Sequence, residues 1–334
     1  MITNKRPIRP QPKRIRIQCL TLAFLAAAVH QQALLAAPAA PAKAPARQPE
    51  KTAGAANTDL GKDWVRLRRD KKNKPLALEV AIVRYIPAAG IPAKNKNSDF
   101  SNSPDYVDLV GAIHVGDRAY YKKLNKRFRS YDALLYELVA PEGTVVEQGR
   151  GTPNTHPLGA LQNGMKSMLE VEHQLEIVDY TRPNFVHADM SPEEFQESMQ
   201  SREESFLQMY FRMAGQAAAI QSQQLADGES TDVDFMMAMF AKDRPRKLKI
   251  AFAKQFESME SLLTSISGPE GSTLITERNK RALEVLRQEL QAGKRKVGIF
   301  YGAGHLADMH ERLIKDFGLT PVNITWLEAW DLKL

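Results

Sequence analysis

The chain has 334 residues, a formal net charge of +7 and a single cysteine, Cys19. Residues 1–42 contain six basic residues and no acid, which leaves +1 of that charge for the rest of the chain. Beyond residue 42 the composition therefore excludes disulfides, thiol catalysis and cysteine-ligated zinc, and it offers no evidence for nucleic-acid binding, which would need a basic surface. Any metal site must use His, Asp, Glu or Asn side chains.

Residues 1–42 have the order of a secretory signal peptide: a basic segment, the apolar run CLTLAFLAAAV and the small residues LLAAPAAPA. The apolar run is shorter than the ~20 residues that span a bilayer, so we expect cleavage near Ala39 or Ala42. An uncleaved membrane anchor is the alternative. The protein is therefore expected to be exported, periplasmic or extracellular, and to meet a membrane only through this segment. Residues 43–62, rich in Ala, Pro, Lys and Gly, are expected to form a flexible spacer.

The first part of the folded region alternates strand and helix patterns. Apolar, β-branched runs predict strands at 76–86, 106–113 and 132–139, and helical spacing of apolar residues predicts a helix at 117–128. A strand–helix–strand order is typical of a βαβ unit with parallel strands.

The middle of the chain, about 158–262, lacks strong strand signals and is interpreted as a helical insertion. Ser191, Pro192 and Glu194 form the pattern of a capping box at a helix start. The Met-rich stretch 199–240 is expected to be core or a mobile hydrophobic cover; binding of haem or a soft metal is the less favoured alternative.

The α/β pattern then resumes, with a predicted helix at 276–291, a strand at 296–301, a helix at 306–317 and a strand at 322–332. The predicted fold is α/β, a mainly parallel sheet flanked by helices, with a central helical insertion, forming one domain over residues 63–334.

Two similar turns carry the histidines of greatest interest. Gly111-Ala112-Ile113-His114 and Gly302-Ala303-Gly304-His305 both have the pattern G-A-x-H, and both follow a predicted strand and precede a predicted helix. Ligands of open α/β sheets bind at the carboxyl ends of the strands, where glycine permits a positive φ and close approach to the backbone. The two histidines are therefore predicted to converge on one metal or one water. A structural hydrogen bond is the alternative for each.

Acidic residues follow both turns at matching distances, which raises the possibility of an internal duplication. Asp117 and Asp308 lie three residues after the histidines, and Glu137 and Glu328 lie 23 residues after them. Glu137 is the strongest candidate, because a carboxylate in the apolar run LLYELV is costly to bury without a partner.

The other candidates have simpler interpretations. Asp117 and Asp308 suit the first turn of a helix, and Glu328 lies in a final strand, which is often at a sheet edge. His187, with Asp189 beside it, could reach the site from the insertion, although a structural role is favoured.

Four segments together resemble the TraB/PrgY/GumN family: VGAIHVGD (110–117), LLYELV (134–139), TERNKR (276–281) and IFYGAGHLADM (299–309). This group includes the Tiki metalloproteases and looks related to the erythromycin-esterase/ChaN-like superfamily. The resemblance covers roughly residues 105–140 and 272–334, and the helical middle carries no matching motif.

The resemblance implies a metal-dependent hydrolase, peptidase-like, with His114, Glu137 and His305 as metal ligands or water activators. It also makes Arg278 a candidate for binding a carboxylate or stabilising an oxyanion; a surface ion pair is the alternative. The metal would be Mn, Co, Zn or Fe, since a mixed His and carboxylate set does not choose among them. The expected substrate is a peptide or a small amide or ester. The alternative function is a non-catalytic protein that binds a peptide, small ligand, haem or metal.

Overall fold

The computed structural model describes residues 60–88, 104–146, 168–205, 207–208, 215, 222, 231–266 and 271–333. The predicted signal peptide, most of the predicted spacer and much of the Met-rich stretch lie outside these residues. Trp64 is almost fully buried, and the first strand starts at the next residue. Among the helices in these ranges, none has the length and apolar character needed to cross a membrane.

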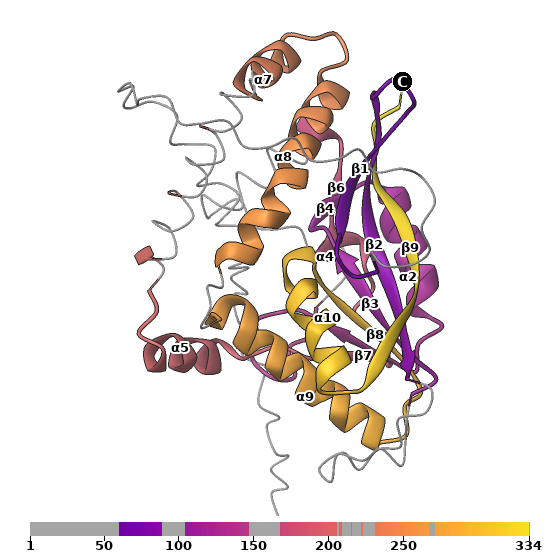
Figure 1. The fold of residues 1–334 in the computed structure, drawn as a ribbon, viewed down its shortest axis with the longest axis vertical. Coiled ribbons are helices and arrows are strands. Elements are labelled where there is room, and N and C mark those ends of the chain that lie inside the picture. Colours follow the sequence, from indigo (N-terminus) through magenta and orange to yellow (C-terminus); the bar gives the residue numbers. More distant parts are fainter. Residues whose placement is uncertain are drawn as a thin grey trace, which may run out of the picture.

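The centre of the molecule is a mixed sheet flanked by helices, which confirms the predicted α/β class (Figure 1). Strands β3, β8, β5 and β7 are parallel and lie side by side in that order, whereas β2 is antiparallel to β1, β3 and β9. Val80 of β2 is opposite both Val65 and Leu327, so β1 and β9 lie on different edges of β2. The strands of this sheet are β1 (Val65–Arg69), β2 (Pro75–Pro87), β3 (Tyr106–Ala112), β5 (Ala133–Tyr136), β7 (Phe185–His187), β8 (Lys296–Gly302) and β9 (Leu319–Asp331).

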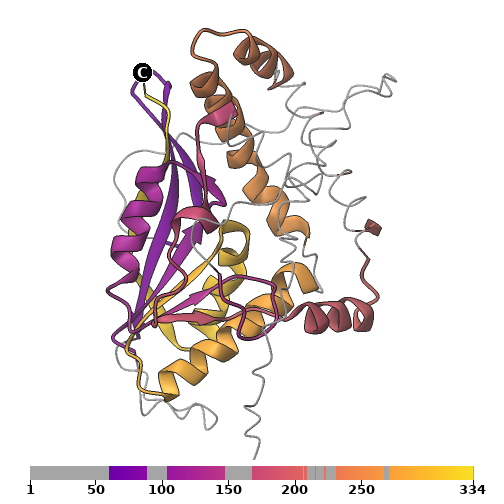
Figure 2. The same ribbon diagram turned by 180° about the vertical axis from the view of Figure 1, so that it is seen from behind.

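Helices cover both faces of the sheet (Figures 1 and 2). Helix α2 (Arg118–Phe128) packs in one apolar core, and α9 (Arg278–Gln291) and α10 (Leu306–Lys315) pack in the other. Adjacent strand residues belong to opposite cores: Phe300 packs with α2, and Ile299 with α9 and α10. Because successive side chains of a strand point to opposite faces, strands buried on both faces are apolar throughout, and this explains the continuous apolar runs in the sequence.

The central region is only partly the helical insertion that the sequence predicts. Its described helices are α4 (Gln174–Ile177), α5 (Pro192–Ser201), α7 (Thr231–Met239) and α8 (Arg244–Ile266). Ser191 caps α5 in a capping box with Glu194, and Pro192 is the first helical residue, as predicted. The same region also contributes strands, which the sequence did not predict. Strand β7 extends the central sheet beside β5, and β6 (Glu172–His173) pairs with β4 (Val115–Gly116). Strands of two or three residues are too short to show an alternating pattern.

Candidate functional site

Three parallel strands end side by side at one edge of the sheet. Ala112, the last residue of β3, is opposite Gly302, the last residue of β8, and β5 ends beside Phe300 at Tyr136. The carboxyl ends of parallel strands are where open α/β sheets bind ligands. The predicted residues that follow these three ends are His114, Glu137 and His305.

Glu137 is held as a buried carboxylate directly after β5, with its side chain only 6% exposed. The backbone N–H of Gly302 donates to Oε2 (2.7 Å), and Arg278 Nη2 donates to Oε1 (2.7 Å). Burial by itself raises the pKa of Glu137, but Arg278, the two histidines and the Gly302 N–H together hold this pKa well below its usual range. The carboxyl is therefore ionised at neutral pH.

Arg278, the first residue of α9, is a buried cation bonded to two carboxylates. Its Nε and Nη2 donate to Oδ1 (2.9 Å) and Oδ2 (2.6 Å) of Asp189, and Nη2 also donates to Glu137. Burial lowers the pKa of Arg278, but Asp189 and Glu137 more than offset this, so that the net shift is upward. Glu137, Asp189 and Arg278 form an ion group with two carboxylates and one guanidinium, so it carries one excess negative charge.

His305 is a buried, neutral imidazole whose tautomer follows from its neighbours. The amide Nδ2 of Asn279 donates to His305 O (3.0 Å) and to Asp308 Oδ2 (2.8 Å), so its Oδ1 must be an acceptor. That Oδ1 lies 2.7 Å from His305 Nδ1, which therefore carries the proton and leaves a lone pair on Nε2. Burial, opposed by Glu137 and assisted by Arg278, lowers the pKa of His305 from 6.5 to about 4.

The lone pair of His305 points into the same group as Glu137. Nε2 lies 3.3 Å from Arg278 Nη1 and 3.6 Å from Glu137 Oε1. His114 follows β3, the strand beside β8, and approaches the same place near Gly302. A Cβ on Gly302 would lie 3.2 Å from Glu137 Oε2 and 4.0 Å from His114 Nε2, so the absence of a side chain leaves room between them. Burial lowers the pKa of His114, and the charge of Glu137 opposes this shift.

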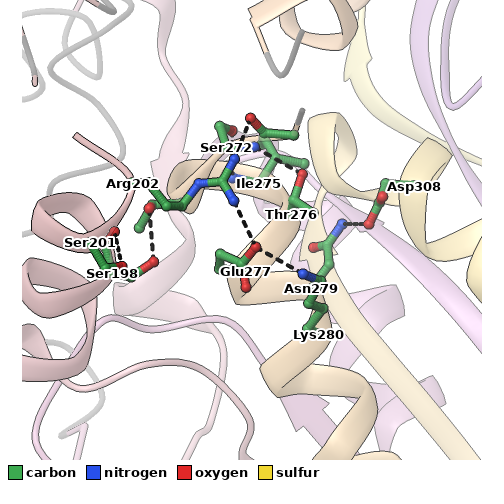
Figure 3. Close-up of polar contacts among 12 residues, drawn as sticks. Ser198, Ser201, Arg202, Ser272, Ile275, Thr276, Glu277, Asn279, Lys280 and Asp308 are labelled. Carbon is green, nitrogen blue, oxygen red and sulfur yellow. Dashed lines mark hydrogen bonds and ion pairs between the residues drawn. The ribbon is translucent and has the colours of Figure 1, made fainter. Parts of the chain in front are cut away.

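The start of α9 is anchored by a polar network that links it to α5 (Figure 3). A π-helical segment, η2 (Thr273–Glu277), runs directly into Arg278. Arg202, at the end of α5, donates to Gly271 O (2.9 Å) and to Glu277 Oε1 (3.2 Å), and Ser272 Oγ caps Ile275 N (3.3 Å). Single π-turns are rare and often occur at functional sites. Here the segment places Arg278 and the next residue, Asn279, against the strand ends.

Two of the weaker candidates lie close to this group without joining it. Asp308 bonds to Asn279 and makes a two-point ion pair with Arg312 (2.8 and 3.1 Å), so it supports the residue that orients His305. His187 Nε2 lies 2.6 Å from Leu138 O. Its neighbour two positions on, Asp189, reaches the group instead. The sequence signal for Asp189 was its place near His187. That it lies two residues beyond the end of a strand follows only from β7, which ends at His187.

The remaining two candidates lie elsewhere. Asp117, at the N-cap position of α2, bonds to Lys249 Nζ (2.6 Å) and to the Asp331 N–H (2.6 Å). Glu328 lies on β9, at the edge of β2 away from β3, where it bonds to Arg68 (3.0 Å) and Lys333 (3.2 Å). Glu137 and Glu328 each lie 23 residues after a histidine, but they occupy positions that are not equivalent in the fold.

The donor atoms suit a divalent metal in their chemistry. Two ligands at ~2.1 Å from a tetrahedral metal are separated by about 3.4 Å, close to the 3.6 Å between His305 Nε2 and Glu137 Oε1. Arg278, however, hydrogen-bonds to both atoms. Within the ranges that the structure describes, no set of three or more His, Cys, Asp or Glu side chains has the arrangement of a metal site. Metal binding by all three predicted ligands would thus require His114 and Arg278 to shift.

A comparison with family models finds no match for this chain, and comparisons with curated proteins and with solved structures likewise find none.

Proposed function

We propose that the protein is an exported, metal-dependent hydrolase, peptidase-like, of the kind that its resemblance to the TraB/PrgY/GumN group implies. The observation that carries this proposal is the convergence of one ionised carboxylate and two imidazoles from the ends of β3, β5 and β8. The neutral His305 and the ionised Glu137 both present lone pairs at neutral pH.

Charge supports the metal part of the proposal. Glu137, Asp189 and Arg278 carry one excess negative charge in a buried place, and an unbalanced buried charge is costly. A bound cation would offset it. Glu137, His305 and His114 would hold the metal, which would polarise a substrate carbonyl and acidify a bound water.

The protein's own groups have separate roles in this proposal. His305 Nε2, free of a proton, would give its lone pair to the metal, so His305 is proposed as a ligand and not as the base. Asn279 keeps that nitrogen in the required tautomer by accepting from Nδ1. The sequence predicts that Arg278 binds a carboxylate or stabilises an oxyanion. In the structure it binds two carboxylates, both of them from the protein itself: Glu137 and Asp189. It is therefore proposed as a positioning residue for Glu137.

The test measures metal content and hydrolysis together. Purified protein is expected to contain a stoichiometric divalent metal and to cleave members of a peptide library after loading with Mn, Co or Zn. His114→Ala and His305→Ala should each lower the bound metal at least tenfold. His187→Ala and Glu328→Gln, which change residues outside the group, serve as matched controls and should retain it.

Two outcomes would overturn the proposal. Unchanged metal content in both histidine variants would show that the metal is not shared between them. Tight metal binding without cleavage of any peptide, amide or ester would favour the non-catalytic binding protein instead.

A further inference from the structure

Large apolar side chains are exposed at the end of α7 and at the turn that leads into α8. Phe240, at this turn, is 88% exposed, and Met237 is 70% exposed. Figure 1 shows the turn at one end of the molecule, beyond the sheet. The exposed apolar residues of this tip are Met236, Met237, Met239 and Phe240.

These side chains are surplus to the packing of the two helices. Phe235 and Phe252 pack edge to face across α7 and α8, with ring centroids 4.8 Å apart. Ala238 and Leu248 are buried in the same apolar core. Within the described residues, the contact between the helices is therefore made by other side chains, and the exposed group lies outside that packing.

Cations surround the apolar tip. Lys242, Arg244 and Lys247 are exposed within seven residues of Phe240. Asp243 is bonded to Arg246 (2.9 Å), and Asp232 and Asp234 precede the tip on α7. Residues 231–254 therefore carry six cations against three acids, a net charge of +3. The surface thus combines exposed apolar side chains with a local positive charge, although the chain beyond residue 42 is nearly neutral.

A cavity of about 460 Å³ lies between the two helices at this tip. Apolar side chains form most of its wall, and two lysines, Lys247 and Lys254, also line it. The tip therefore has a mainly apolar recess with two cations at its wall.

We propose that the α7–α8 tip is a docking surface for an anionic lipid bilayer. Phe240 and the exposed methionines would enter the boundary between headgroups and acyl chains, while Lys242, Arg244 and Lys247 contact the anionic headgroups. The charge around the tip and its place at one end of the molecule favour a membrane surface over a groove for a folded partner. This contact is separate from the predicted N-terminal segment, and it does not depend on the proposed hydrolase activity.

The first experiment measures binding of the full chain to phosphatidylcholine vesicles with and without phosphatidylglycerol. Lys242→Gln/Arg244→Gln/Lys247→Gln should weaken binding to the anionic vesicles on the order of 100-fold, at about fivefold per cation. The matched control, Lys122→Gln/Lys123→Gln/Lys126→Gln, removes the same charge from exposed positions of α2 and should bind like the wild type. If the two variants lose the same affinity for anionic vesicles, binding depends on the net charge of the protein and not on the tip, and the proposal is overturned.

The second experiment separates the tip from the N-terminal segment, which is common to all variants. Phe240→Trp adds a tryptophan at the tip, and its fluorescence is obtained by subtracting the wild-type spectrum. This fluorescence should shift to shorter wavelength on anionic vesicles and be quenched by brominated acyl chains. Phe240→Ser should weaken binding to the vesicles. The control is Val145→Ser, which changes an exposed apolar residue (70%) outside the tip and should not weaken binding. If the Phe240→Trp protein binds the vesicles and its added emission stays unchanged, the proposal is overturned and the surface is left to a protein partner.

Discussion

Arg278 balances its charge against two buried carboxylates, and its own side chain is only 1% exposed. A helix-surface arginine was the simpler interpretation of the sequence motif TERN. The structure instead turns the guanidinium inward, because α9 begins at the strand ends and its first residue faces Glu137 and Asp189. Buried charges persist only when they are paired and hydrogen-bonded, so removing one of the three residues leaves its partners with an uncompensated charge.

Replacing Arg278 with Met should lower the free energy of unfolding by about 3–5 kcal/mol, because two carboxylates would remain buried without a counter-ion. The control is Arg281→Met on the same helix, where a long, partly exposed ion pair with Glu284 (3.8 Å) is lost. That change should cost less than about 1 kcal/mol. Urea unfolding of both variants measures the difference, and similar costs would contradict the paired role of Arg278.

At the scale of elements, the two G-A-x-H turns use their glycines for different purposes. Glycine would permit a positive φ at these turns, but Gly302 has φ −51°, and neither Gly111 nor Gly302 is among the described residues with positive φ. Gly111 lies inside β3, where a Cβ would meet Val80 Cγ1 at 2.4 Å. Gly302 instead faces the site and donates its N–H to Glu137. Gly111 serves the close packing of β3 beside β2, and Gly302 serves the carboxylate.

Substituting alanine at each position should therefore separate stability from function. Gly111→Ala should cost about 1–3 kcal/mol of unfolding free energy through overpacking. Gly302→Ala should displace the carboxylate of Glu137, 3.2 Å from the new Cβ, and lower metal affinity or hydrolysis at least tenfold with a smaller loss of stability. Urea unfolding and activity are measured for both variants. A larger loss of stability in Gly302→Ala than in Gly111→Ala would refute this division.

Most regular elements could be predicted because their patterns are local. The long strands β2, β3, β8 and β9, the helices α2, α9 and α10, and the cap of α5 all lie within a few residues of the predicted segments. The short strands β6 and β7 and the π-helical segment η2 could not be predicted, since pairing with distant segments and a polar network define them.

At the scale of the whole molecule, the site ties the stability of the fold to pH. The pKa of His305 is lowered from 6.5 to about 4 by burial, so the unfolded chain binds this proton at a higher pH than the folded protein does. Stability from His305 is complete above pH 6.5 and is lost as the pH falls towards 4. Glu137 acts in the same direction at lower pH, since its folded pKa lies well below its usual range.

The unfolding free energy should therefore fall between pH 6.5 and 4, with His305 contributing on the order of 3 kcal/mol to that fall. His305→Gln removes one titrating group and should reduce the slope in this window; His114, whose pKa burial also lowers, keeps part of it. His187→Gln should keep the wild-type slope, because His305 remains. Chemical denaturation across this pH range measures all three proteins, and a wild-type slope in His305→Gln would show that His305 does not titrate as expected.

The sequence by itself determined the α/β class and predicted that His114, Glu137 and His305 would meet. It could do so because apolar periodicity is local, and because the carboxyl ends of parallel strands lie at one edge of a sheet. Only the tertiary structure decided that β8 lies between β3 and β5, that β9 pairs with β2, and that Asp189 completes the ion group around Arg278. Strand order and buried charge pairing depend on contacts between residues far apart in the chain, and no local pattern records those contacts.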